Sequence, residues 1–363
     1  MINPATYTAE WIESVSRSLN NADRILVEKV IRALTLLTEL KNHKLDFIFK
    51  GGTALLLLLP KPARMSIDID IILPPENKHT EDIFNSMVSK GIFTHYVQQE
   101  RHIDSLIEKA HYKFFYTPAF KTYGAEDNIL LDILYEKNPY SIINQVPVNT
   151  PFLKWDTAPV SVSVPGIECI LGDKLTAFAP NTTGVPYFKK ETSMSMEIIK
   201  QLFDIGQLFN FVNDLPAVAE TFYLIAKNEL SYRKLKQFTP ADVLEDIFQT
   251  ALCLSLRGAA GKGDFVQLQS GIGRLKAMIF SENFILEKAI IAASKAAYIS
   301  RCIASGGNSF EKFDDAMPMH DWIIQQPHET KLNKLKKSLP EAFFYWYKAI
   351  QIMNTNLTDY SNN

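Results

Sequence analysis

The stretch KGGTALLLLLPKPARMSIDIDIIL, residues 50–73, decides the fold of this chain. It follows a β-rich segment at residues 45–50, opens with two glycines, and continues as an apolar helical segment that prolines end. Its last part alternates, which predicts a strand with isoleucines on one face and Ser66, Asp68 and Asp70 on the other. We therefore expect a strand, a glycine turn, a short helix and a second strand in this order.

The two acids on the second strand, Asp68 and Asp70, are expected to project side by side. Neighbouring carboxylates repel each other, and a divalent cation between them removes that cost. Mg²⁺ or Mn²⁺ accepts such hard oxygen ligands and also contacts phosphate oxygens during nucleotidyl transfer. The alternative interpretation is an amphipathic edge strand whose acidic face is simply solvated.

The turn before the helix favours the metal interpretation. Gly51 and Gly52 allow the backbone to come close to a triphosphate, and the start of the helix offers free N–H groups. The hydroxyl of Thr53 adds a donor. Arg64 and Ser66 supply a cation and a second hydroxyl, although Arg64 alone equally fits a surface side chain. Together these residues predict an NTP site whose phosphates lie over the turn.

A metal site of this kind needs a third carboxylate on a neighbouring strand, and Asp132 is the candidate. It interrupts the apolar run at residues 129–134, where a charge has no structural reason to be. We expect Asp132 to complete the metal site and to help deprotonate an acceptor hydroxyl. The alternative places Asp132 on the solvent face of an edge strand. His95, His102 and His111 do not have the spacing of metal ligands on a helix.

Composition limits the class of protein. Hydrophobic residues make up 47% and charged residues 21% of 363 residues, which is typical of a globular protein with a core and excludes a mainly disordered chain. The net charge of −2 excludes a global basic field. Three widely separated cysteines predict neither disulfides nor zinc, and no secretory signal or membrane span is expected. These features indicate a cytoplasmic protein without a membrane partner.

The expected fold class is α+β, with two domains. Strand patterns almost vanish after about residue 166, and helical periodicity dominates from there to the C-terminus. We expect residues 1–175 to form the core with its N-terminal helices. Residues 176–363 are expected to form a mainly helical C-terminal domain.

The motifs resemble the AbiEii/AbiGii toxin family of nucleotidyltransferases, whose signature is roughly GGTAL followed by R-x-S-x-D-I-D. Residues 50–55 and 64–70 carry that signature. Residues 172–177 are similar to the family's E/D-K-L-x-A helix, and residues 200–205 to its K-D-L-x-D-L helix. The resemblance covers roughly residues 30–210. It implies a DNA-polymerase-β-like nucleotidyltransferase core, with a mixed sheet flanked by helices, and a helical C-terminal part.

The resemblance also implies roles for two later residues. Lys174 would contact the triphosphate, and Asp204 would belong to the last motif, near the nucleotide or metal site. Gln201 departs from the family by replacing the first acid of that motif. Family members include toxins of type IV toxin–antitoxin and abortive-infection systems, and some transfer nucleotides from an NTP to the 3′ acceptor end of tRNA. A cognate antitoxin and an RNA acceptor are therefore implied as partners.

The sequence thus predicts a Mg²⁺-dependent nucleotidyltransferase that moves NMP from an NTP to an acceptor, with tRNA as the candidate, as the toxin of such a system. Two alternatives stay open. The same residues fit an NTP-dependent phosphotransferase that acts on protein. They also fit a non-catalytic module that binds nucleotide.

Overall fold

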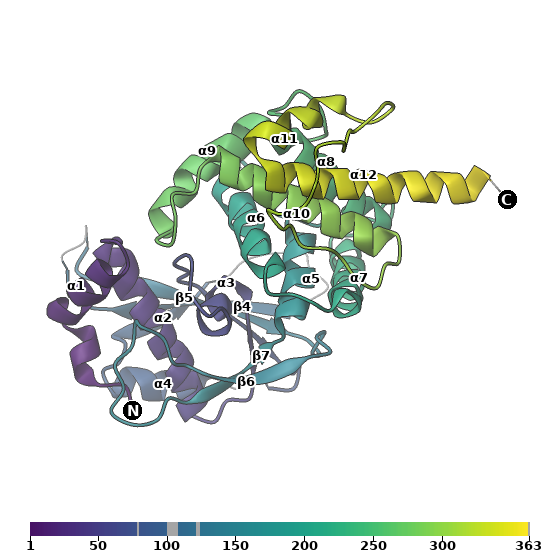
Figure 1. Ribbon diagram of the computed structural model, residues 1–363. Coiled ribbons are helices and arrows are strands. Elements are labelled where there is room, and N and C mark those ends of the chain that lie inside the picture. The colour runs from purple at the N-terminus through teal and green to yellow at the C-terminus, as the bar shows by residue number, and fades with distance from the viewer. Residues whose placement is uncertain (78–79, 100–107, 121–123, 362–363) are drawn as a thin grey trace. The chain divides into compact units, whose positions relative to one another are not determined.

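The computed structural model describes residues 1–77, 80–99, 108–120 and 124–361, and side chains as far as residue 354, so His102 lies outside the described residues. The described residues form two compact units (Figure 1). The first unit contains Met1–Gly166 and Ala277–Asn283, and the second contains Ile167–Lys276 and Phe284–Asn363. The second unit therefore begins nine residues before the sequence-based boundary at 175/176. The reason is that α5 (Ile167–Ala177) packs against α6 (Ser195–Phe209) and α7 (Leu215–Tyr232) of that unit.

A mixed sheet of seven strands forms the centre of the first unit, in the order β3-β4-β5-β2-β1-β7-β6 within the described residues. The pairs β2–β5 and β1–β7 are parallel, and the others are antiparallel. Both β2 and β5 lie inside the sheet, so interpreting either one as an edge strand is wrong. The strands are β1 (Ile48–Lys50), β2 (Ile69–Leu73), β3 (His95–Gln98), β4 (Glu108–Tyr116), β5 (Asp127–Tyr135), β6 (Ile143–Pro147) and β7 (Ser161–Pro165).

Helix α2 (Arg24–Asn42) covers one face of this sheet. It begins at Asp23, whose carboxylate accepts hydrogen bonds from the first free N–H groups of the helix. Lys29 forms an ion pair of 2.7 Å with Asp127 on β5, and the Arg32 guanidinium lies 4.8 Å from the ring centre of Tyr116 on β4. Because Asp127 and Tyr116 are register partners, these contacts show which face α2 covers.

Helix α4 (Glu81–Ser89) covers the same face further along the sheet. The fully buried ring of Phe84 packs edge-on against Tyr96, Tyr112 and Phe114, with centroid distances of 5.3, 4.9 and 5.0 Å. Side chains alternate along a strand, so the intervening residues of β4 and β5 project from the opposite face. Asp132 lies on that opposite face, which we call the open face because the side chains of Asp132 and His95 on it are 35% and 46% exposed and Val97 is 47% exposed.

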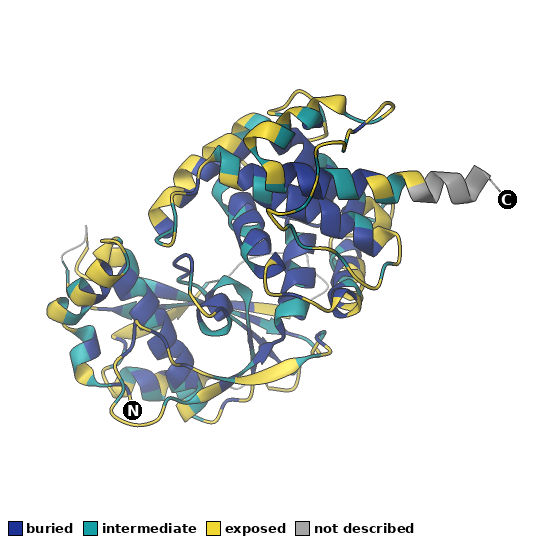
Figure 2. Cartoon of the chain, viewed as in Figure 1, coloured by how far each residue is buried: buried dark blue, intermediate teal, exposed yellow. Residues whose placement is uncertain are grey.

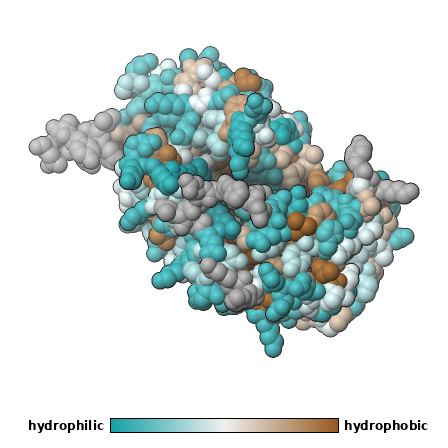
Figure 3. Space-filling view, turned by 180° about the vertical axis from the view of Figure 1, so that it is seen from behind, coloured by the Kyte–Doolittle hydropathy of each residue, from teal (hydrophilic) through white to brown (hydrophobic). Residues whose placement is uncertain are grey.

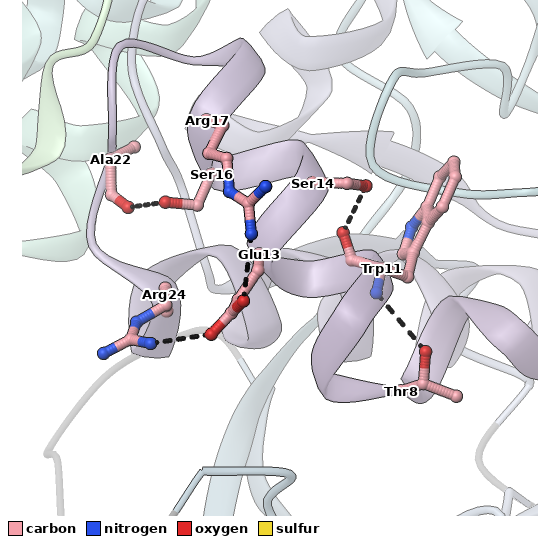
Figure 4. Close-up of polar contacts among 8 residues, drawn as sticks. All are labelled: Thr8, Trp11, Glu13, Ser14, Ser16, Arg17, Ala22 and Arg24. Atoms are coloured by element: carbon pink, nitrogen blue, oxygen red, sulfur yellow. Dashed lines mark hydrogen bonds and ion pairs between the residues drawn. The ribbon is translucent and has the colours of Figure 1, made fainter.

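Helix α1 (Ala9–Ser18) meets α2 at a polar corner (Figure 4). Glu13 pairs with Arg17 at 3.2 Å and with Arg24 at 2.9 Å, and these arginine side chains are 73% and 54% exposed. Exposed pairs contribute only about 0–1 kcal/mol each. The buried side chains Ile12 and Val15 therefore hold the corner more firmly than its charges. A single 3-10 turn, η1 (Pro4–Tyr7), precedes α1.

The second unit is helical around α10, most of whose residues are buried (Figure 2). Helix α10 packs against α6, α8 and α12. The predicted α+β class, with a helix-flanked mixed sheet followed by helices, is confirmed. The elements are α5, α6 (Ser195–Phe209), α7 (Leu215–Tyr232), α8 (Pro240–Ser255), α9 (Phe265–Leu275), α10 (Leu286–Ala304), α11 (Leu335–Ser338), α12 (Pro340–Ser361), the hairpin β8 (Phe188–Lys189) and β9 (Thr192–Ser193), and the turns η2 (Lys276–Met278) and η3 (Thr330–Lys334).

Hydrophobic groups on the face drawn in Figure 3 form separate spots on a mainly hydrophilic surface. Scattered apolar side chains of this kind are normal for a folded chain in water. No helix in the described part of the chain combines the length and the apolar character that crossing a bilayer requires.

The packing of Phe84 generates a stability prediction. Phe84→Ala removes the ring that joins α4 to β3 and β4, so we expect the free energy of unfolding in urea to fall by about 3–5 kcal/mol. The control is Phe188→Ala, because the Phe188 ring is 47% exposed. Its loss should change stability by less than about 0.5 kcal/mol. Equal stability of the two variants would contradict the packing of α4 described above.

Candidate active site

Gly51 brings the start of α3 (Gly51–Leu58) against the acidic strand. Its φ of +81° lies in the left-handed region, which favours glycine. A Cβ at this position would lie 2.2 Å from Oδ2 of Asp70, so a side chain there collides with that carboxylate. The requirement for glycine follows from both facts. The carboxylate of Asp70 therefore lies against the N-terminus of a helix, where N–H groups and the helix dipole favour negative charge.

Gly52 makes room for a different pair of side chains. A Cβ at Gly52 would lie 2.5 Å from Nη2 of Arg64 and 3.0 Å from Oγ of Ser66. Arg64 is 6% exposed, and its Nη1 donates a hydrogen bond of 2.9 Å to the carbonyl of Met65. The interpretation of Arg64 as a surface side chain is therefore wrong. Its guanidinium lies against the glycine turn.

The buried side chain of Thr53 connects the start of α3 to the segment before β2. Its side chain is fully buried, and its hydroxyl lies 2.5 Å from the carbonyl oxygen of Asp68, to which it donates. The same hydroxyl lies 2.9 Å from Oγ of Ser66. These contacts hold the start of α3 on the segment that leads into β2. A phosphate contact through the Thr53 hydroxyl stays a prediction, because that group already has partners within the protein.

A row of ionisable side chains crosses four neighbouring strands at the level of Asp70. The register pairs Lys50 on β1 with Asp70 on β2, Asp70 with Asp132 on β5, and Asp132 with His111 on β4. Register partners on adjacent strands project from the same face, with Cβ atoms about 5 Å apart. Asp68 lies two residues before Asp70, just outside β2. The acids predicted from sequence thus lie on adjacent segments of one sheet face.

Sequence reasoning assigned no role to Lys50 in this row, and it also missed His111. Its Nδ1 lies 2.6 Å from Oδ1 of Asp132, and the two side chains are 11% and 35% exposed. The other ring nitrogen, Nε2, is buried and has no hydrogen-bond partner among the described residues. Because His111 holds one oxygen of Asp132, it limits how that carboxylate can turn. Strand alternation around residue 111 could have indicated the face of His111, but not its partner.

Metal binding by the acids stays a prediction. Across residues 1–77, 80–99, 108–120 and 124–354, no three His, Cys, Asp or Glu side chains are grouped as in a metal site. Two cavities of the first unit, of about 610 and 690 Å³, are lined by other residues. One lies at the α1–α2 corner, beside Arg17 and Arg24, and the other beside Ile48 and Ile72. The row from Lys50 to His111 lies on the sheet face opposite α2 and α4.

Comparison with known proteins identifies the family. No curated protein matches this chain in sequence. The model of the family described as "Nucleotidyl transferase AbiEii toxin, Type IV TA system" matches residues 35–269, which is more than half of the chain. The chain belongs to the AbiEii family. The resemblance inferred from the glycine turn and the acidic strand is confirmed, and the chain is a nucleotidyltransferase.

Several solved structures are similar at low sequence identity. MenT4, a nucleotidyltransferase toxin from Mycobacterium tuberculosis H37Rv, is 14% identical, with 66% of this chain and 77% of that chain covered and a TM-score of 0.44. JHP933 from Helicobacter pylori is 17% identical, with 77% and 92% covered and a TM-score of 0.40. An antigenic nucleotidyltransferase-like protein from Paracoccidioides brasiliensis is 13% identical, with 58% and 91% covered and a TM-score of 0.35.

Two further residues implied by the AbiEii motifs, Lys174 and Asp204, come together in the second unit. Nζ of Lys174 lies 2.9 Å from Oδ2 of Asp204, and the two side chains are 9% and 1% exposed. Lys174 also donates a hydrogen bond of 2.9 Å to Oε1 of Gln201. Gln201, the residue that departs from the motif, therefore supports the lysine. Contacts of Lys174 and Asp204 with a nucleotide stay predictions.

The glycine turn generates a prediction with a matched control. Gly51→Ala should lower nucleotidyl transfer by about 100-fold, because its Cβ displaces the Asp70 carboxylate. Gly91 also has a positive φ, +72°, but a Cβ there meets nothing within 4 Å. Both variants should lose roughly 1–2 kcal/mol of stability from the left-handed backbone. Transfer from α-labelled NTPs and thermal unfolding separate the two effects. Equal activity of both variants would exclude the contact as a functional constraint.

Proposed function

We propose that this AbiEii-family enzyme transfers NMP from an NTP to an RNA acceptor, at the open sheet face that carries Asp68, Asp70 and Asp132. One observation carries the proposal: the Asp70 carboxylate lies against Gly51 at the start of α3. Helix starts of this kind bind phosphate, and paired acids bind divalent cations. The two kinds of group are adjacent here, as nucleotidyl transfer requires.

The donor set fits a hard divalent cation, Mg²⁺ or Mn²⁺. Asp70 and Asp132 are register partners on parallel strands, and Asp68 precedes Asp70 by two residues. All three offer carboxylate oxygens, the ligands that these ions prefer. A bound ion supplies charge neutralisation at the phosphate oxygens. The proposed ligands are therefore Asp68, Asp70 and Asp132.

Groups of the protein itself would bind the phosphates and accept the proton of the acceptor hydroxyl. Backbone N–H groups at Gly51 and Gly52 would hold the phosphates, with Arg64 behind them and Thr53 and Ser66 holding the turn in shape. The acceptor oxygen would form a bond to the α-phosphorus while the bond to the leaving pyrophosphate breaks. Asp132 would accept the hydroxyl proton. Catalysis of this kind depends mainly on positioning and on preorganised charge.

The biological setting is also part of the proposal. The family match supports a toxin of a type IV toxin–antitoxin system, and we propose tRNA or another RNA as the acceptor and a cognate antitoxin as the regulator. We propose the cytoplasm as its location, where NTPs and RNA occur together. The proposed roles of Lys174 at the triphosphate and of Asp204 near the nucleotide rest on the family motifs alone.

Substitution of the paired acids tests this function. Asp68→Asn combined with Asp70→Asn keeps the side-chain size and removes both charges, so transfer of α-label from each NTP to total RNA should disappear. Asp46→Asn is the control, since Asp46 is an exposed acid of the same unit. Transfer retained by the double variant would remove the mechanism. Transfer of γ-label to protein, with no α-label on RNA, would identify a phosphotransferase instead.

The contact between His111 and Asp132 yields a second prediction for this site. His111→Leu removes the donor to Asp132, and we expect activity to fall about 10–100-fold and the required Mg²⁺ concentration to rise. His111→Asn keeps a donor near the position of Nδ1 and should retain most of the activity. Thermal unfolding of both variants monitors folding. Identical Mg²⁺ dependence of the Leu and Asn variants would mean that His111 does not position Asp132.

A further inference from the structure

The order of the strands indicates the side from which the acceptor reaches the site, if the proposed function holds. The glycine turn follows β1, and Asp70 is on β2, the next strand of the sheet. In-line displacement requires the attacking oxygen to lie opposite the leaving pyrophosphate. With the phosphates at the start of α3, on the β1 side of Asp70, the acceptor comes from the other side. That side of the sheet contains β5, β4 and β3.

The open face of β3 and β4 carries a pair of stacked rings. His95 and Phe115 are register partners. Their rings stack, with centroids 4.3 Å apart and planes 6° from parallel. The His95 side chain is 46% exposed. Val97, two residues further along β3, is 47% exposed. These side chains alternate with Tyr96 and Phe114, which pack under α4, so they project from the face that carries Asp132.

Two cations lie on the same face of β4. Lys109 and Lys113 lie an even number of residues from Phe115, so their side chains project from the same face of β4. Lys113 is the register partner of Val97 on β3 and of Leu130 on β5. Neither lysine forms an ion pair with another residue in the described part of the chain. One acid is nearby, because Oε1 of Glu126 lies 3.7 Å from Nδ1 of His95. The surface therefore combines a planar aromatic pair with positive charge.

The spacing fits a nucleic-acid strand. Phe115 lies four residues along β4 from His111, and β4 lies two strands from β2. Strand dimensions put Phe115 roughly 16 Å from Asp70, about 13 Å along the strand and about 10 Å across the sheet. This distance is a span of a few nucleotides. An acceptor whose terminal hydroxyl reaches Asp132 would have its preceding bases over β4 and β3.

We propose that the open face of β3 and β4 binds the unpaired bases that precede the reacting hydroxyl of a single-stranded RNA end. The rings of His95 and Phe115 form the stacking platform, and Lys109 and Lys113 lie beside the backbone phosphates. Aromatic stacking accepts every base, and the positive charges of Lys109 and Lys113 attract phosphates. A protein acceptor offers neither bases nor a phosphate backbone. Paired RNA would not bind there, because its bases are already stacked on each other.

The full chain with single substitutions tests this platform. Phe115→Leu keeps an apolar side chain and removes the ring face, so the KM for RNA should rise roughly 5- to 100-fold. The KM for the NTP should stay unchanged. Phe115→Trp should keep wild-type KM values, and Phe188→Leu, at an exposed ring of the second unit, is the matched control. A labelled single-stranded oligoadenylate RNA, with its blunt duplex as comparison, measures binding without NTP.

The outcomes separate the platform from the proposed function. Normal transfer to RNA with an unchanged KM in Phe115→Leu would overturn the platform and leave the function intact. Equal binding of single-stranded and duplex RNA would also overturn it. Absence of α-label on any RNA with the wild-type chain would reject the function itself. Label found on protein alone would overturn both, since the acceptor would then carry no bases.

Discussion

The structure depends on the close approach of the Gly51 backbone to the side chain of Asp70. The left-handed φ of Gly51 and the absence of a Cβ allow α3 to begin directly against the Asp70 carboxylate. Gly52 admits Arg64 in the same way, and the buried Thr53 hydroxyl fastens the turn to the carbonyl of Asp68. Three consecutive residues thus bring a helix N-terminus and an acidic strand together. Any side chain at the first of these positions would separate them.

The strand pairing of the sheet adds further ionisable side chains to the contact between Gly51 and Asp70. Parallel pairing of β2 with β5 brings Asp132 into register with Asp70, and antiparallel pairing of β5 with β4 brings His111 to Asp132. Like charges on adjacent strands are unfavourable by themselves. Here the cation Lys50 borders the two acids on one side, and the imidazole of His111, 2.6 Å from Asp132, borders them on the other. The helices α2 and α4 occupy the other face.

The Lys174–Asp204 pair shows how the helical unit stabilises the buried charge of Lys174, a residue of the family motifs. Both side chains are almost completely buried, which is costly for isolated charges. The ion pair and the amide of Gln201 give the lysine two partners at 2.9 Å. Removal of one partner would leave the other charged and buried. The glutamine at position 201 is therefore suited to this arrangement although it departs from the motif.

Local patterns in the sequence determined much of the fold. The alternation around Asp68 and Asp70, the two glycines, and the change to helical periodicity depend only on neighbouring residues, and the sequence therefore predicted the acidic strand, the helix start and the α+β class. It also indicated Asp132, because a charge inside an apolar run is visible without a structure.

Only the tertiary structure decided which strands lie side by side and which side chains contact each other. Four features depend on contacts between different segments of the chain. They are the contact of Asp132 with His111, the burial of Arg64, the place of α5 in the second unit and the stacking of His95 on Phe115. Periodicity gives the face on which a side chain lies but not the strand beside it. Strand order and register follow from long-range packing, and no local pattern of residues encodes them.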